Sequence, residues 1–175
     1  YTALLYALMG CIFVVTSFFL PLVSFAETHD YTLIFLLTAF AILPFIFGVP
    51  LGLLADQADK KSLRTAILKA LLLLALIPLL ENLWLKLGVV FAAGLCVYYS
   101  MLVLERAATD HETRAHMGSL SGAFLSVYQI AQIAAPIIFG FLIDFRSLEF
   151  AIFALSAAGL VIVTPLFFRR VTISI

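Results

Sequence analysis

Four polar side chains inside apolar segments are the strongest candidates for contact with a small molecule. Tyr99, Ser121, Tyr128 and Gln132 each offer a hydrogen-bond donor and an acceptor. The last three share one helical face, because positions four and seven residues apart lie on the same side of a helix. A polar side chain in hydrocarbon costs roughly 2 to 7 kcal/mol unless it meets water, a solute or another helix. We expect these residues to border a solute cavity, with hydrogen bonding between helices as the alternative.

The placement of charged and sulfur-containing side chains argues against several kinds of chemistry. No Asp, Glu, Lys, Arg or His lies near the centre of an apolar stretch, so no proton relay is predicted. Cys11 and Cys96 form no Cys-x-x-Cys pair, so neither a metal site nor a cofactor is expected. Glu105 and Arg106 come at the end of a stretch, where we expect them to pair locally or to contact the 52–64 loop.

Two classes of membrane enzyme lack their signature residues. A rhomboid-type protease needs a Gly-x-Ser-Gly nucleophile and a histidine within the membrane, but residues 119–122 are only a partial match and all three histidines lie in loops. A CDP-alcohol phosphotransferase needs two complete aspartate motifs, and Asp56 with Asp59 supplies only the start of one. The sequence therefore predicts no enzyme.

Composition identifies the elements that must position these residues. Of the 175 residues, 65% are hydrophobic and 11% charged, and mean hydropathy is +1.19, which excludes a soluble fold. A spanning helix needs about 20 mainly apolar residues. This criterion predicts an all-α, integral membrane six-helix bundle in one domain, residues 1–175. The expected spans are 1–26, 31–55, 63–80, 87–106, 117–143 and 149–168. Lys69 lies inside the third span and can extend its ammonium to the head groups.

Charge predicts the orientation and the partners. Ten Lys plus Arg balance ten Asp plus Glu, so the chain carries no basic footprint for nucleic acid. Sorting the basic residues by alternate loops gives two on one face, Lys86 and Arg146. The other face has eight: Lys60, Lys61, Arg64, Lys69, Arg106, Arg114, Arg169 and Arg170. By the positive-inside rule we expect the face with eight, and both ends of the chain, to be cytoplasmic, in the plasma membrane or a bacterial inner membrane.

A short internal repeat suggests that three helices are used twice. Residues 52–56 (Gly-Leu-Leu-Ala-Asp) end the second span, and residues 140–144 (Gly-Phe-Leu-Ile-Asp) end the fifth, 88 positions later. Because an odd number of spans separates them, the two copies face opposite sides of the membrane, as inverted repeats do. A rival register aligns residues 44–48 with residues 136–140.

The loop after the second span carries a recognisable motif. It resembles the signature loop of the major facilitator superfamily, Gly-x-Leu-Ala-Asp-Arg-x-Gly-Arg-Lys. Gln57 and Asp59 depart from that pattern. The matching positions are Gly52, Leu54, Ala55, Asp56 and Lys61, with Lys60 a conservative replacement. A second resemblance lies around the fifth span, at Arg114, Gly118, Pro136 and Gly140.

The resemblance implies one half of a transporter, built from two inverted three-helix repeats. It implies a small-molecule solute, a lipid bilayer around the bundle, and a second six-helix half of the same protein as partner. The first, second, fourth and fifth helices would then line the cavity, and the third and sixth would face lipid. Gly52, Asp56, Lys60 and Lys61 would form the loop that switches conformation. Gly52 would let helices approach closely, and Asp56 would accept hydrogen bonds from a helix N-terminus.

Two questions about the larger protein stay open in the sequence. A start without Met and a short tail after the last span favour the C-terminal half over the N-terminal one. A non-transporting sensor or scaffold module of a larger protein is the alternative function.

Overall fold

The computed structural model describes residues 1–109 and 114–167, which form six helical rods and no strand. The first rod joins α1 (Thr2–Val14), the π-helical segment η1 (Val15–Phe19) and α2 (Leu20–Thr28). The second joins α3 (Tyr31–Ile42), the 3-10 segment η2 (Leu43–Phe47) and α4 (Gly48–Ala55). The others are α5 (Lys60–Leu76) with η3 (Ile77–Leu79), α6 (Leu83–Thr109), α7 (Arg114–Phe145), and α8 (Leu148–Val163) with η4 (Thr164–Leu166).

Five of these rods are long and apolar enough to cross a membrane. The sixth rod covers the predicted span 149–168 as far as Leu166, but its α-helical part, Leu148–Val163, has 16 residues and is too short to meet this criterion. The third and fourth rods begin earlier than hydropathy indicated. Asp59 caps α5, and the Asn82 Oδ1 atom accepts hydrogen bonds from the Trp84 and Leu85 amides at 2.9 and 3.2 Å. Apolar content locates the middle of a helix, whereas the capping side chain fixes where it begins.

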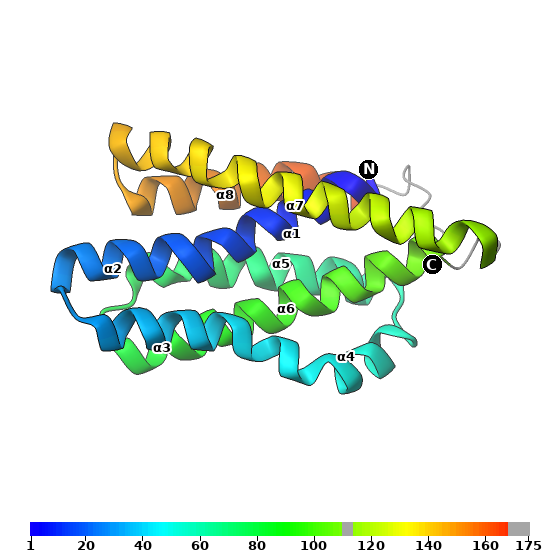
Figure 1. The fold of residues 1–175 in the computed structure, drawn as a ribbon, viewed down its shortest axis with the longest axis horizontal. Coiled ribbons are helices and arrows are strands. Elements are labelled where there is room, and N and C mark those ends of the chain that lie inside the picture. Colours follow the sequence, from blue (N-terminus) through cyan, green and yellow to red (C-terminus); the bar gives the residue numbers. More distant parts are fainter. Residues whose placement is uncertain (110–113, 168–175) are drawn as a thin grey trace.

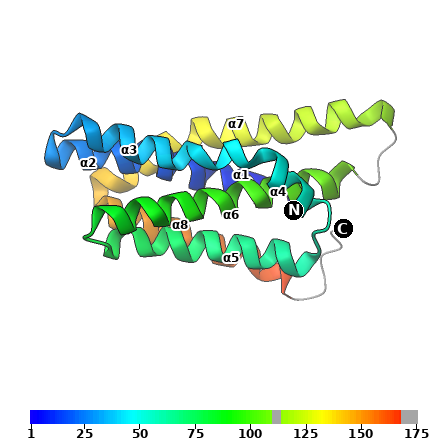
Figure 2. The ribbon, with the colours of Figure 1, turned by 90° about the horizontal axis from the view of Figure 1, so that it is seen from below.

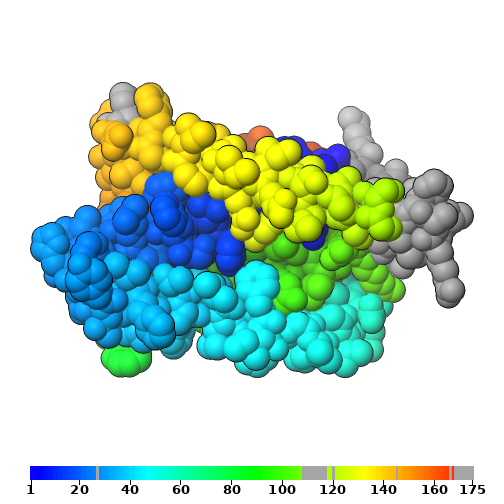
Figure 3. Space-filling view, in the orientation of Figure 1, coloured from blue at the N-terminus to red at the C-terminus, as the bar shows by residue number. Residues whose placement is uncertain are grey.

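The rods form two layers with α6 between them. Figures 1 and 2 show the first rod, the second rod and α7 on one side, and α5 and α8 on the other. In the space-filling view α6 is visible between α7 and α4 (Figure 3). The first rod is the most buried of the five candidate spans, because 61% of its most apolar 18-residue segment is buried, against 17% for the second rod and 22% for α7. The second rod and α7 therefore leave broad apolar faces uncovered within this chain.

Prolines explain the irregular stretches within the rods. Pro21 has no N–H for the carbonyl four residues earlier, and the π-helical segment ends just before it. Pro44 lies in η2, the 3-10 break in the second rod, whereas Pro136 stays inside α7. The third and sixth rods both end in a 3-10 turn, at Pro78 and Pro165, which are 87 positions apart. This spacing is close to the 88 positions that separate residues 52–56 from residues 140–144, although the inverted repeat itself stays a prediction.

The loops divide between the two ends of the bundle. Tyr1 and the 56–59 loop lie at one end, and the α2–α3 and α7–α8 connections lie at the other (Figure 1). At the first end the Arg64 guanidinium lies 4.6 Å from the centre of the Phe167 ring. The side chain of Arg114, and all of Arg169 and Arg170, lie outside the described residues.

Gly94 tests the packing of α6 against the proline break. A Cβ at Gly94 would lie 2.7 Å from the Pro44 Cγ atom and 3.3 Å from the Ala41 carbonyl oxygen, whereas a Cβ at Gly88 on the same helix would meet nothing within 4 Å. Alanine raises helix propensity equally at both positions. We expect Gly94→Ala to be less stable than Gly88→Ala by about 1–3 kcal/mol, because overpacking displaces a rigid ring. Thermal unfolding of the purified protein measures this, and equal midpoints would contradict the packing.

Candidate functional site

Six aromatic rings contact one another in a series that crosses four helices. We call this series the aromatic band: Phe124 and Tyr128 of α7, Tyr6 and Phe13 of α1, Phe45 of η2, and Tyr98 of α6. The ring centres of consecutive members lie 5.4 Å (Phe124 to Tyr6), 6.1 Å (Tyr6 to Tyr128), 6.4 Å (Tyr128 to Phe13), 5.5 Å (Phe13 to Phe45) and 4.5 Å (Phe45 to Tyr98) apart. These spacings are those of favourable aromatic pairs.

A glycine and a proline make these contacts possible. Tyr6 and Phe13 are seven residues apart, so they lie on one face of α1 with Gly10 between them. A Cβ at Gly10 would lie 3.1 Å from Tyr128 Cδ2, so the missing side chain lets the Tyr128 ring approach α1. At the other end of the band, Phe45 follows Pro44 in the 3-10 segment, where it reaches both Phe13 and Tyr98.

Burial differs along the aromatic band. Tyr6 and Tyr128 are 5% and 8% exposed, so the part between α1 and α7 is closed by packing. Phe45 is 37% exposed, and Phe13 and Tyr98 are partly exposed, so the part over η2 and α6 is open. Ring faces bind planar apolar groups and cations, and phenol hydroxyls add a donor and an acceptor. This surface suits a solute with an apolar body and few polar groups.

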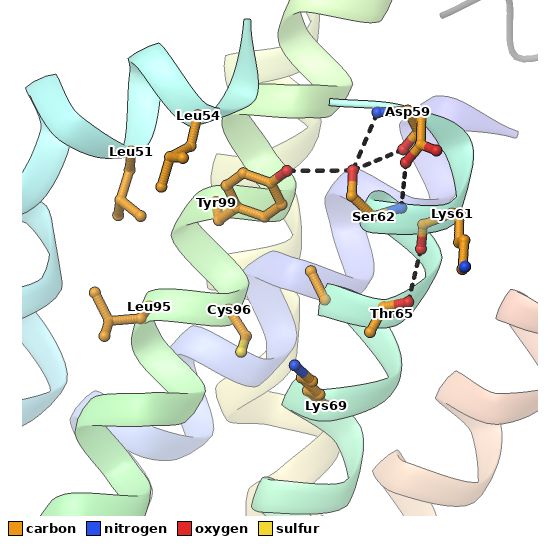
Figure 4. Close-up of a pocket in the computed structure, with 11 residues that line it drawn as sticks. Leu51, Leu54, Asp59, Lys61, Ser62, Thr65, Lys69, Leu95, Cys96 and Tyr99 are labelled. Atoms are coloured by element: carbon orange, nitrogen blue, oxygen red, sulfur yellow. Dashed lines mark hydrogen bonds between the residues drawn. The ribbon is translucent and has the colours of Figure 1, made fainter. Parts of the chain in front are cut away.

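The structure brings together some of the predicted cavity residues and separates one. Tyr128 belongs to the aromatic band, and Gln132 follows it one helical turn later on the same face of α7. Ser121, also on α7, is partly exposed. Tyr99 lies elsewhere, because its hydroxyl donates to the Ser62 Oγ atom of α5 at 3.2 Å (Figure 4). Its neighbour Tyr98 is the α6 residue in the band.

Sequence reasoning missed Tyr6, Phe13, Phe45, Phe124 and Tyr98 as site residues. We searched for polar side chains, whereas the contacts are between ring faces and edges. A usable signal was present in α1, where Tyr6 and Phe13 flank Gly10 at helical spacing. The contribution of Phe45 depends on the proline break, which the sequence places but does not orient.

Several serine and threonine hydroxyls within the rods bond to their own helix, which neither sequence-based alternative anticipated. Thr16 Oγ1 donates to the Ile12 and Phe13 carbonyls at 3.1 and 3.0 Å. Three serines likewise donate to the carbonyl four residues earlier: Ser17 at 2.7 Å, Ser100 at 2.7 Å and Ser126 at 2.8 Å. Such bonds satisfy a hydroxyl in hydrocarbon without a partner helix. These residues therefore carry no argument for a polar cavity.

The loop between the second and third rods is fixed from two sides. The Arg106 Nη1 atom of α6 donates to the Ala55 carbonyl, the last residue of α4, at 2.8 Å. This confirms the predicted contact of Arg106 with the loop. On the other side, the Asp59 carboxylate accepts from the Ser62 amide at 2.7 Å, and the Asp59 amide donates to Ser62 Oγ at 3.1 Å. This reciprocal pair is a capping box that begins α5.

Two expectations for this loop are wrong within the described chain. The carboxylate at the N-terminus of α5 belongs to Asp59, whereas Asp56 is the C-cap of α4 and its amide donates to the Gly52 carbonyl at 2.9 Å. A Cβ at Gly52 would meet nothing within 4 Å, so Gly52 allows no close helix contact inside this chain. The predicted switch residues Asp56, Lys60 and Lys61 are all exposed at this end of the bundle.

Hydrogen bonding also sets the electrostatics of Asp59. The Ser62 amide, the Ser62 hydroxyl and the charge of Lys61 all favour the ionised carboxylate and hold the pKa of Asp59 below its ordinary value, against a smaller desolvation effect. The described residues contain no cluster of three His, Cys, Asp or Glu side chains that could hold a metal ion.

Comparison with known proteins identifies one family. The sequence model described as Major Facilitator Superfamily matches residues 2–173, nearly the whole chain. Comparison with curated proteins and with solved structures gave no significant match.

Asp59→Asn tests the charge of the α5 cap, because asparagine keeps the acceptor oxygen and removes the charge. The folded-state pKa of Asp59 is lowered, so its charge stabilises the fold above the unfolded-state pKa of about 3.9, and this contribution is lost as pH falls through the folded value. We expect the wild type to unfold at a higher temperature than Asp59→Asn above about pH 5, and the gap to close in more acidic buffer. A gap independent of pH would contradict this assignment.

Proposed function

This chain belongs to the major facilitator superfamily, and we propose that it supplies one six-helix half of a transporter that moves a small solute by alternating access. The family match makes the chain part of an integral membrane protein of a transporter family. The aromatic band is the observation that supports a solute site, because it joins α7, α1, η2 and α6 through ring contacts. These segments are the fifth, first, second and fourth rods, which the family resemblance assigned to the cavity.

The uncovered apolar faces support a second half as partner. The second rod exposes Phe35, Ile46 and Val49 by more than 70%, and α7 exposes Ile133 and Ile137 by 70% and 73%. In the proposed arrangement these two rods flank the cavity, so part of each face meets the other half and the rest meets lipid. The layer formed by α5 and α8 then packs against the lipid of the bilayer.

The proposed solute is apolar or weakly polar. No Asp or Glu lies near the middle of a span in the sequence, and the charged residue in the middle of the third rod is Lys69, so this half offers no carboxylate for ion coupling. Phenol hydroxyls of the aromatic band and the amide of Gln132 supply the few polar contacts. A sensor or scaffold module has no specific observation in its favour among the residues that the structure describes.

The orientation is proposed from charge. Lys60, Lys61, Arg64 and Arg106 belong to the end of the bundle with the 56–59 loop, and Lys86 and Arg146 to the other end. We assign the more basic end to the cytoplasm, in the plasma membrane or a bacterial inner membrane. Asp56, exposed at that end, is the residue we assign to switching between inward-open and outward-open states.

Cysteine accessibility tests the cavity. With Cys11 and Cys96 replaced by serine, we expect Gln132→Cys to react with a small hydrophilic thiol reagent, because a cavity holds water. Leu160→Cys on α8 is the control and should stay unreactive against lipid. A solute that the protein takes up in proteoliposomes should slow the labelling of Gln132→Cys. An unreactive Gln132→Cys in a protein shown to transport would make this face of α7 a packing surface.

Asp56→Asn tests the switch loop. Removing the charge should slow exchange between the two states on the order of tenfold, the value of one charge-assisted hydrogen bond, and leave solute affinity unchanged. Solute exchange across vesicles and equilibrium binding measure the two quantities separately. Asp30→Asn is the control, because Asp30 caps α3 at the opposite end and asparagine retains that cap. Weaker binding with normal exchange would place Asp56 in solute recognition instead.

A further inference from the structure

A groove on the side of the bundle lies outside the aromatic band and has no role in the proposed transport. It has a volume of about 510 Å³ and lies between α4, α5 and α6 (Figure 4). We call it the lateral groove. Its walls differ in chemistry, because α5 supplies the polar residues and the other two helices supply mainly apolar ones. Its lining residues include Asp59, Ser62, Thr65 and Lys69 of α5 and its cap, Leu51 and Leu54 of α4, and Leu95, Cys96 and Tyr99 of α6.

The polar wall follows one side of α5 from its cap into the membrane-spanning part. Asp59, Ser62, Thr65 and Lys69 succeed one another at intervals of three or four residues, which places them along one helical face. Lys69 is nine residues beyond the first residue of α5, about 14 Å along the helix axis. Lys69 is exposed, and Figure 4 shows its side chain beside Thr65 and Cys96. A lysine at this depth extends its ammonium back along the helix toward the head-group region, where an anion can meet it.

The hydrogen bonds in the groove involve the polar side chains of its lining but not the ammonium of Lys69. The Asp59 carboxylate is occupied by the Ser62 amide, and Thr65 Oγ1 donates to the Lys61 carbonyl at 2.7 Å. Tyr99 donates to Ser62 Oγ, which itself donates to the Asp59 carbonyl at 2.8 Å. Within the described ranges, no hydrogen bond or ion pair is recorded for the Lys69 ammonium. Lys69 therefore retains three donors for a ligand.

The apolar wall decides what kind of anion fits. Leu54 is 58% exposed, and Leu51 and Leu95 are partly exposed, so they form a hydrocarbon strip opposite Lys69. A small inorganic anion gains nothing from such a strip. An acyl chain buries apolar surface against it at roughly 25 cal/mol per Å². The occupant must join an anionic group to a hydrocarbon chain.

We propose that the lateral groove binds one anionic phospholipid from the leaflet on the side of the 56–59 loop. Its phosphate lies beside Lys69 and Thr65, and one acyl chain lies along Leu51, Leu54 and Leu95. Lys61 also lines the groove and adds a second positive charge. Asp59 stays ionised, so Lys61, Lys69 and Asp59 give the lining a net charge of +1, which favours an anionic head group.

Native mass spectrometry of the full protein tests this proposal with phosphatidylglycerol and phosphatidylcholine as probes. We expect the first phosphatidylglycerol to bind more tightly than phosphatidylcholine. Lys69→Gln should weaken phosphatidylglycerol binding about fivefold, as expected for one basic residue near a lipid surface, and leave phosphatidylcholine binding unchanged. Lys69→Arg should restore the preference, which separates loss of charge from loss of fold. Lys86→Gln, at the opposite end of the bundle, is the matched control and should have no effect.

Three outcomes would overturn the proposal. Equal binding of the two lipids to the wild type would mean that Lys69 only extends its ammonium to the head groups. Displacement of phosphatidylglycerol by millimolar inorganic phosphate would make the groove a small-anion site. Lys69→Gln could also leave phosphatidylglycerol binding and the unfolding temperature unchanged. This result would mean that the other half of the transporter covers the groove. None of these outcomes depends on whether the protein transports a solute.

Discussion

Satisfaction of backbone hydrogen bonds in hydrocarbon is the constraint on which the whole structure depends. No water is available inside a bilayer, so each rod must pair its own N–H and carbonyl groups. Prolines remove backbone N–H donors at several points. Near two of them the α-helix is replaced by a π-helical segment at Val15–Phe19 and by a 3-10 segment at Leu43–Phe47. Hydroxyl groups follow the same rule, since Thr16 and Ser100 bond to carbonyls of their own helices. The hydroxyls of Thr16 and Ser100 are therefore satisfied within their own helices and do not mark a site.

Close helix contacts arise where glycine has no side chain, opposite a ring at Gly10 and Gly94 and opposite Leu71 at Gly159. Gly10 meets the Tyr128 ring and Gly94 meets the Pro44 ring, whereas Gly52, in the loop motif, meets nothing inside the chain. Within hydrocarbon, apolar side chains gain little by leaving lipid, so van der Waals contact and shape decide which helices associate. The aromatic band is a consequence of this rule, because its rings fill the spaces that small residues and the proline break create.

The helices could be predicted from the sequence where their position depends on apolar composition. Apolar length located all six rods, and the loop motif at residues 52–61 identified the family that the comparison then matched. Helix starts were not predictable from apolar length, because Asp59 and Asn82 set them through capping. The site was predicted in part. Tyr128 and Gln132 lie together, but the other rings of the band depend on helix rotation, which no single span specifies.

Tyr98 and Tyr99 show why rotation matters most for function. They are adjacent in sequence, and consecutive residues of an α-helix point about 100° apart. Tyr98 contacts Phe45 in the aromatic band, whereas Tyr99 donates to Ser62 in the lateral groove. Further along α6, Arg106 holds the end of α4 through the Ala55 carbonyl. One helix thus contacts the proposed solute site, the lateral groove and the loop assigned to switching. A rotation of α6 would therefore move residues of all three places together.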